Sequence, residues 1–159
     1  MKLATLLFLI EKKNNKINRI CLSMKKRGFG VGRYNGVGGK VEKDETVEEA
    51  CKREVLEEIG VEVLDMKKVA ELEFIFSEKP DWNQKVFTFF CEEWKGHPEE
   101  SEEMNPKWFL VGDIPFHNMW SDDIFWLPKV LENELVKARF VFDNNDTVQD
   151  QELKSVEHF

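Results

Sequence analysis

A glycine-rich segment leads directly into an acidic helix between residues 28 and 60, and this combination strongly limits what the chain can fold into. Six glycines fall between Gly28 and Gly39. Such density predicts a loop whose backbone closely approaches another group. Thr46 followed three residues later by Glu49 is the pattern of a capping box. Helical spacing of apolar residues follows, and Gly60 predicts the end of that helix.

Three glutamates of this helix, Glu54, Glu57 and Glu58, are spaced i, i+3 and i+4, which predicts that they share one helical face. Like charges placed in this way repel, and a solvated acidic face is the ordinary explanation of such a cluster. A divalent cation would remove the repulsion, since carboxylate oxygens suit Mg²⁺ or Mn²⁺. The glycine-rich loop, with Glu45 and Arg53 on the same segment, favours the metal-binding interpretation.

The segment from Gly39 to Val61 resembles the signature of the Nudix family. That signature is a glycine, five residues, Glu, seven residues, then Arg-Glu-apolar-x-Glu-Glu-x-Gly-apolar. Its positions are filled here by Gly39, Glu45, Arg53, Glu54, Val55, Glu57, Glu58, Gly60 and Val61. The resemblance implies a curved mixed β-sheet between helices, an α/β/α sandwich of the α+β class. It also implies hydrolysis of a nucleoside diphosphate linked to another group.

The same resemblance implies a role for each matched residue. Glu54, Glu57 and Glu58 would ligate Mg²⁺, or else Mn²⁺, and one of them would also act as the base. Arg53 completes the implied catalytic set by orienting a glutamate. Glu45 would brace the helix through Arg53, and the glycine that ends the helix would be structural. The implied metal site consists of Gly38, Glu54, Glu57, Glu58 and Glu103.

Segments outside the signature resemble those Nudix proteins that act on purine nucleoside triphosphates. The segments are 24–36, 102–104, 114–123 and 146–147. The resemblance implies that Asn35 hydrogen-bonds the base and that Trp120 stacks on it. Asp122 and Asp123 would face its Watson–Crick edge. The other substrate-binding residues implied are Thr5, Lys25, Phe29, Gly39, Lys40, Phe74, Phe76 and Met104.

Taken singly, these pocket residues have ordinary structural explanations. Trp120 could be a core tryptophan, Asp122 and Asp123 a helix start, and Asn35 a turn residue. Their joint occurrence with the signature favours a purine pocket. Two adjacent carboxylates in a dry pocket also predict a raised pKa for one of them. One neutral and one ionised acid would then offer both a donor and an acceptor, so that one pocket accepts 8-oxoguanine and 2-hydroxyadenine.

These features predict a metal-dependent pyrophosphohydrolase of oxidised purine nucleoside triphosphates. Its main substrates would be 8-oxo-dGTP and 2-hydroxy-dATP, cut between the α- and β-phosphates to the monophosphate and pyrophosphate. Alkylated purines such as O6-methyl-dGTP and N6-methyl-dATP are further expected substrates by resemblance alone. Two alternatives stay open. One is a Nudix pyrophosphatase for another nucleoside diphosphate derivative, and the other is a non-catalytic Nudix nucleotide-binding module.

Composition limits the partners and the compartment. The length of 159 residues with 42% hydrophobic residues fits a single domain over residues 1–159. A net charge of −8 gives no electrostatic footprint for a nucleic-acid polymer, although a small nucleotide held by a metal ion is compatible with it. Three scattered cysteines indicate a reducing compartment, the cytoplasm, with a nuclear or mitochondrial pool left open. We expect a monomer.

The remaining pattern predicts mostly strands. The longest apolar run, Leu3–Ile10, is too short to span a bilayer and predicts a buried strand. A polar turn is expected over 11–19, and Ser121 is expected to cap a second helix that Pro128 bends. Compared with the purine-specific relatives, the loop at 80–85 is altered, with Trp82 or Gln84 expected at the pocket edge. The other expected strands are 20–24, 61–64, 69–76, 85–92, 107–111, 140–142 and 147–156.

Overall fold

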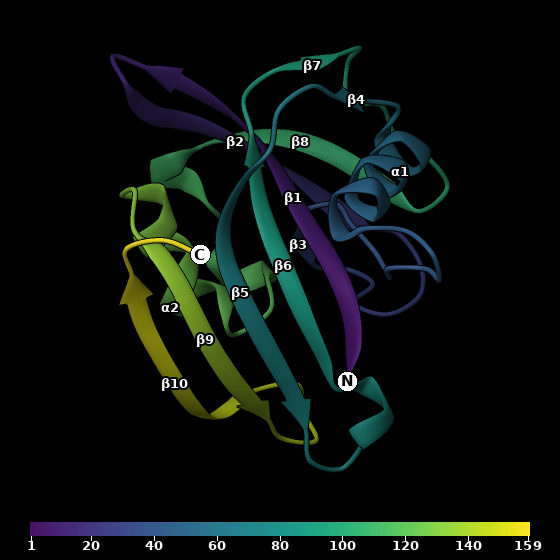
Figure 1. Cartoon of the computed structure of the whole chain (residues 1–159), viewed down its shortest axis with the longest axis vertical. Helices are drawn as coiled ribbons and strands as arrows, with labels where there is room; N and C mark the ends of the chain where they lie inside the picture. The colour runs from purple at the N-terminus through teal and green to yellow at the C-terminus, as the bar shows by residue number, and fades with distance from the viewer.

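The computed structural model describes residues 1–159 and is built around one curved mixed sheet (Figure 1). The strands of this sheet are β1 (Lys2–Lys13), β2 (Lys16–Lys25), β3 (Tyr34–Asn35), β5 (Lys67–Phe76), β6 (Gln84–Cys91), β8 (Met104–Leu110), β9 (Leu135–Phe142) and β10 (Val148–Val156). They are arranged in the order β10-β9-β5-β6-β1-β2-β3, and β8 pairs with β2. The β1–β6 and β5–β9 pairs are parallel and the other pairs are antiparallel.

Two helices cover opposite faces of this sheet. The elements outside the sheet are α1 (Val47–Ile59), α2 (Asp123–Leu131), the small β4 (Glu62–Val63) and β7 (Trp94–Lys95) pair, and the short 3₁₀ turns η1 (Pro80–Trp82), η2 (Val111–Asp113) and η3 (Phe116–Asn118). Alternate side chains of β1 enter different cores, as expected for period-two strand geometry. Leu6 and Phe8 share a core with Trp126 of α2, whereas Leu7 packs with Val55 of α1. The predicted α/β/α arrangement is confirmed.

Helix α1 begins and ends where the sequence predicts. The Thr46 hydroxyl accepts the backbone N–H of Glu49 at 3.1 Å, and the Glu49 carboxylate accepts the N–H of Thr46 at 2.9 Å. Gly60 ends the helix with φ 72°, in the left-handed region that favours glycine. The capping box therefore fixes the start of the helix that carries the glutamates.

The predicted polar turn over 11–19 is wrong. Strands β1 and β2 continue through most of that stretch, and Lys13 pairs with Lys16. The turn consists only of Asn14 and Asn15, whose φ values are 55° and 64°. Asparagine tolerates the left-handed conformation that tight hairpin turns need, so polar residues on either side are free to extend the strands.

The start of α2 also differs from the prediction. The helix begins at Asp123, and Ser121 does not cap it. The Ser121 hydroxyl instead accepts the N–H of Val148 at 3.0 Å and donates to the carbonyl of Asp146 at 3.3 Å. Pro128 lies inside the helix as expected.

The other predicted strands are present with shifted ends. The largest change is β9, which is eight residues long where only 140–142 is expected. Strand β8 begins at Met104, before the predicted start at 107. No helix of the structure is both long enough and apolar enough to cross a membrane.

Candidate active site

The glycine-rich loop lies directly against β1 and α1. The backbone N–H of Thr5 donates to the carbonyl of Gly39 at 2.8 Å, and the N–H of Gly39 donates to the Thr5 hydroxyl at 3.3 Å. A Cβ on Gly38 would lie 1.9 Å from the Thr5 carbonyl oxygen, and one on Gly39 would lie 2.5 Å from the carboxyl carbon of Glu54. These contacts confirm the close backbone approach that the glycines predict.

Arg53 joins this loop to the acidic helix. Its Nη2 and Nε donate to the two carboxylate oxygens of Glu45 at 2.7 and 3.1 Å, which is a bidentate ion pair. Its Nη1 donates to Glu54 at 2.9 Å, and its Nη2 also reaches the carbonyl of Lys40 at 3.2 Å. The hydrogen bond from Arg53 holds the pKa of Glu45 below its ordinary value. This network fixes the carboxylate of Glu54 beside the loop.

The three glutamates of the signature do not have equal surroundings. Glu58 is buried and Glu54 is largely so, while the Glu57 side chain is 59% exposed and lies 3.5 Å from Arg53. Burial, reinforced by the negative charges of Glu54 and Glu103, raises the pKa of Glu58 to about 8, although Lys25 opposes the change. One oxygen of the Glu58 carboxylate is buried without a hydrogen-bond partner.

Glu103 reaches this place from outside the signature. Strand β8 pairs with β2 so that Lys25 lies opposite Met104, which directly follows Glu103. The Lys25 ammonium is 3.7 Å from the Glu103 carboxylate. The pairing therefore brings a lysine and a further carboxylate toward Glu58, where the Lys25 charge lowers the pKa of Glu58 and the Glu103 charge raises it.

The donor set fits a hard divalent cation, although no three acidic, histidine or cysteine side chains lie close enough together to hold one as they stand. Glu58 keeps an unpaired buried oxygen, and Glu54 and Glu103 add charge repulsion. Oxygen donors of this kind suit magnesium or manganese, which complete their coordination with water and substrate phosphates. These residues are compatible with the divalent metal that the resemblance to the Nudix family implies.

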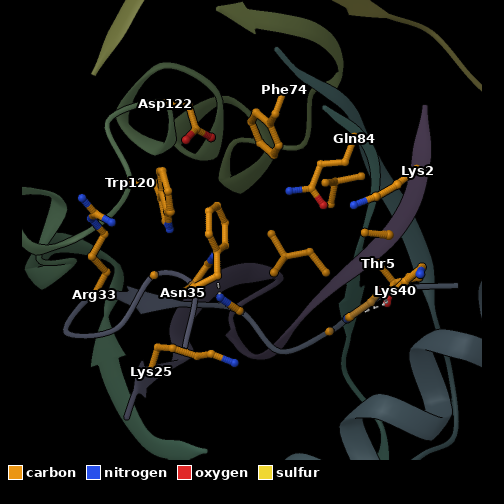
Figure 2. Close-up of a pocket in the computed structure, with 18 of the residues that line it drawn as sticks. Lys2, Thr5, Lys25, Arg33, Asn35, Lys40, Phe74, Gln84, Trp120 and Asp122 are labelled. Carbon is orange, nitrogen blue, oxygen red and sulfur yellow. Dashed lines mark hydrogen bonds between the residues drawn. The ribbon is translucent and has the colours of Figure 1, made fainter. Parts of the chain in front are cut away.

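A cavity of about 300 Å³ opens beside this cluster (Figure 2). Figure 2 shows Trp120 and Asp122 on one side of it and Lys2 and Thr5 on another. All the residues predicted to bind the substrate line this cavity, namely Thr5, Lys25, Phe29, Asn35, Gly39, Lys40, Phe74, Phe76, Met104, Trp120, Asp122 and Asp123. The sheet thus gathers in one place side chains that are far apart in the sequence.

Trp120 is the centre of an aromatic group on this cavity. Phe29 stacks on its indole at 5.0 Å between ring centres with a 29° interplanar angle. Phe76 and Phe142 contact the indole edge to face at 6.4 and 5.8 Å. Arg33 places its guanidinium 4.3 Å from the ring centre. Sequence reasoning assigned Arg33 no role, because nothing local to it signals a tryptophan 87 positions away.

Asp122 and Asp123 form a buried acid pair at the same cavity, with 2% and 3% of their surfaces exposed. The indole N–H of Trp126 donates to Asp122 at 2.8 Å. One oxygen of Asp123 is buried without a partner. Burial raises the pKa of Asp122 to about 6. Burial and the neighbouring Asp122 charge raise the pKa of Asp123 well above its ordinary value.

Asn35 and the altered loop complete the cavity. The Asn35 side-chain oxygen accepts the N–H of Gly36 at 2.8 Å, so its amide NH₂ group is the part left to bind a ligand. Gln84 lines the cavity, whereas Trp82 does not. Trp82 packs behind Phe29 at 5.0 Å between ring centres. The structure therefore settles which of the two expected loop residues reaches the cavity.

Sequence comparison identifies the class of protein that this fold and cavity define. The NUDIX domain model matches residues 2–130, and the chain belongs to the Nudix family. It is 43% identical over 141 residues to the mouse oxidized purine nucleoside triphosphate hydrolase, covering 89% of this chain and 90% of that protein. It is 40% identical over 156 residues to the zebrafish protein of the same name, covering 98% and 96%.

Solved structures agree on the fold. A mutator MutT protein from Bacillus halodurans matches with a TM-score of 0.83 and 23% identity. The match covers 97% of this chain and 98% of that one. At this identity the similarity establishes the Nudix fold, which is the fold that the sequence predicts.

Proposed function

We propose that the protein hydrolyses oxidised purine nucleoside triphosphates, mainly 8-oxo-dGTP and 2-hydroxy-dATP, to the monophosphate and pyrophosphate. The observation that carries the proposal is the position of the cavity. It places Trp120 and the Asp122–Asp123 pair within the same depression as Lys25 and Gly39, which border the signature glutamates. The mouse and zebrafish relatives bear the name of this activity. Removing such nucleotides would keep them out of DNA.

Recognition of the base would combine stacking with hydrogen bonds. Stacking on Trp120 favours any base about equally, so discrimination has to come from polar groups. Asn35 offers an amide donor, and the acid pair offers a shared proton. With the proton on Asp123 and the charge on Asp122, or the reverse, the pair would present a donor and an acceptor in either order. This exchange would let one cavity hold both oxidised bases.

On the catalytic side, Glu54, Glu57, Glu58, Glu103 and the Gly38 carbonyl would hold Mg²⁺, with Mn²⁺ as a substitute. When bound, such an ion screens the phosphate charge and lowers the pKa of water. Arg53 keeps Glu54 oriented toward the loop, and one of the glutamates accepts the proton of the attacking water. Lys25 and Lys40 lie at the cavity and carry charge suited to the phosphates.

The same proposal includes the state of the protein. We propose one domain of residues 1–159, acting as a monomer in the cytoplasm, and whether a nuclear or mitochondrial pool also exists stays open. The net charge of −8 supports small nucleotides rather than nucleic-acid polymers as partners. Alkylated purine triphosphates are proposed as secondary substrates, and the direct test is to include them in the substrate panel.

A substrate panel in H₂¹⁸O tests the activity. The purified chain with Mg²⁺ is given 8-oxo-dGTP, 2-hydroxy-dATP, O6-methyl-dGTP, N6-methyl-dATP, dGTP, dATP, NAD and a dinucleoside tetraphosphate. We expect the oxidised purines to show the highest kcat/KM, with monophosphate and pyrophosphate as products. The label identifies whether water attacks the α- or the β-phosphate. A higher kcat/KM for NAD or for the dinucleoside tetraphosphate would contradict the proposal. It would favour the alternative, a Nudix pyrophosphatase for another nucleoside diphosphate derivative. Binding without turnover would favour the non-catalytic module.

A further inference from the structure

Trp120 contacts a charged pair that the roles above do not use, of which Arg33 lines the cavity and Asp146 does not. The guanidinium carbon of Arg33 lies 4.3 Å from the centre of the indole, and Nη2 of Arg33 is 3.7 Å from the Asp146 carboxylate. Figure 2 shows Arg33 on the side of Trp120 turned away from Phe74 and Gln84, which lie across the cavity. We propose that Arg33 and Asp146 are positioning residues that fix the plane of Trp120 for stacking on the base.

The backbone sets the proximity of Arg33 and Trp120. Tyr34 at the start of β3 forms an isolated parallel bridge with Met119. Arg33 precedes Tyr34 and Trp120 follows Met119, so each lies one residue from the bridge. The contact between guanidinium and indole therefore follows from strand pairing and not from a chance encounter of two mobile side chains.

The position of Asp146, the second residue of the pair, is fixed by contacts of its own turn. It lies in the turn between β9 and β10 with φ 58°. Its carbonyl accepts the Ser121 hydroxyl at 3.3 Å, and the same hydroxyl accepts the N–H of Val148 at 3.0 Å. Ser121 is the residue after Trp120. The turn thus contacts both Ser121, the neighbour of Trp120 in the chain, and Arg33, so the three segments that hold the indole are joined to one another.

Arginine suits this position for a physical reason. Its guanidinium is planar, weakly hydrated and charged at all relevant pH values, so it stacks on an aromatic face while still pairing with a carboxylate. Phe29 stacks on the same indole at 5.0 Å, so a base that stacks on Trp120 has to take the place of Phe29 while Arg33 keeps its contact with the ring. Without Arg33, the indole could tilt from the orientation that a flat base needs. The expected effect is weaker base binding with an unchanged chemical step.

The test separates binding from chemistry in the full chain. Arg33→Leu should raise KM for 8-oxo-dGTP and the Kd for 8-oxo-dGMP, measured by calorimetry, by about tenfold, with kcat changed less than about twofold. Arg33→Lys keeps the charge without the planar stacking group and should raise both by about threefold. Asp146→Asn should also raise them by about threefold. The double variant Arg33→Leu/Asp146→Asn should bind no more weakly than Arg33→Leu, because the two residues act through one contact.

A matched control lies elsewhere in the chain. Arg19 places its guanidinium 4.9 Å from the ring centre of Trp108 and lies 3.4 Å from Glu11, and none of these residues lines the cavity. Arg19→Leu therefore removes the same kind of contact and should leave KM and Kd unchanged. An equal loss in this variant would assign the effect to general destabilisation and would overturn the inference.

The inference rests on the proposed role of Trp120, and Trp120→Ala distinguishes the two failures. If Trp120→Ala weakens nucleotide binding while the Arg33 and Asp146 variants bind normally, the positioning role is wrong and the proposed function stands. If Trp120→Ala itself binds normally, the proposed stacking fails as well. A fall in kcat at unchanged Kd would also contradict the positioning role. Should Arg33→Leu not fold, Arg33→Lys and Asp146→Asn decide the question by the same two measurements.

Discussion

The two ends of the site are assembled in opposite ways. Most of the glutamate end comes from one stretch, residues 38–60, in which Arg53 pairs with Glu45 eight residues before it, and only Lys25 and Glu103 join it from other segments. The base end takes Asn35, Phe74 and Trp120 from separate parts of the sequence. The difference teaches that the residue spacing within one segment can encode the chemistry of a site. Its selectivity depends on the pairing register of strands that are far apart in the sequence.

Buried acids occur at both ends but in different surroundings. Glu58 has Lys25 and two further carboxylates around it, an environment that a cation can enter. Asp122 and Asp123 lie in the interior, where Trp126 is the hydrogen-bond donor. Each end keeps one buried carboxylate oxygen without a partner. The first arrangement suits a metal ion, and the second suits a proton shared with a base.

The largest effect is expected from a substitution that changes the glutamate end alone. Glu58→Gln should lower kcat by at least about a thousandfold, because it removes a charged ligand and a candidate base. The Kd for 8-oxo-dGMP should change less than about threefold, since the base end is untouched. Product analysis measures kcat, and calorimetry measures the Kd. Glu48→Gln, an exposed change on the same helix, is the control, and a comparable loss of kcat there would contradict the assignment.

A smaller effect is expected when the base end loses its stacking surface. Trp120→Ala should raise KM for 8-oxo-dGTP by about 10- to 100-fold, in line with about 1–3 kcal/mol for stacking on one aromatic side chain. The kcat should fall much less than in Glu58→Gln. Steady-state kinetics at saturating Mg²⁺ measure both. A loss confined to kcat would place Trp120 at the wrong end of the site.

Selectivity should change when the acid pair cannot exchange its proton. Asp122→Asn and Asp123→Asn each fix one neutral group, so the ratio of kcat/KM for 8-oxo-dGTP and 2-hydroxy-dATP should shift by about tenfold in at least one variant. The ratio is measured with both substrates in competition. If both variants leave both activities as they are in the wild type, the shared-proton hypothesis is wrong.

The smallest expected effect concerns stability. The raised pKa values of Asp122 and Asp123 mean that the folded state binds protons more tightly than the unfolded chain. Stability from this pair is therefore present at low pH and lost as pH rises from about 4 through about 6 and above. The double variant Asp122→Asn/Asp123→Asn cannot ionise at these positions, so it does not lose this stability as the pH rises. Its Tm should exceed that of the wild type by a few degrees more at pH 8 than at pH 5, measured by calorimetry.

The sequence predicts both ends of the helix that carries the glutamates, for a physical reason. Thr46, Glu49 and Gly60 act through hydrogen bonds or dihedral angles close in the chain, and each is found as predicted. Ser121 fails as a predicted cap because its hydroxyl bonds to the distant β9–β10 turn. Arg33 is missed for the same reason, since its partners Trp120 and Asp146 are brought to it only by strand pairing.

The loops show the same limit. Asn14 and Asn15 form a two-residue turn where a long polar turn is expected, because strand pairing of the charged flanks cannot be seen from one strand alone. The altered loop leaves Trp82 and Gln84 as equal alternatives in the sequence. Their assignment needs the β6 register, in which Gln84 pairs with Lys2 and Phe74 across the two neighbouring strands.

Gly38 has a consequence for the whole site. It lines the cavity, and any Cβ there would collide with the Thr5 carbonyl of β1. A Cβ on the neighbouring Gly39 would instead meet the carboxylate of Glu54, which lies at the end of a side chain that can move. Gly38 and Gly39 therefore affect both the cavity that would bind the base and the position of the Glu54 carboxylate. A methyl group on Gly38 would push the loop away from β1, and one on Gly39 would displace the Glu54 carboxylate, so either substitution would disturb the site.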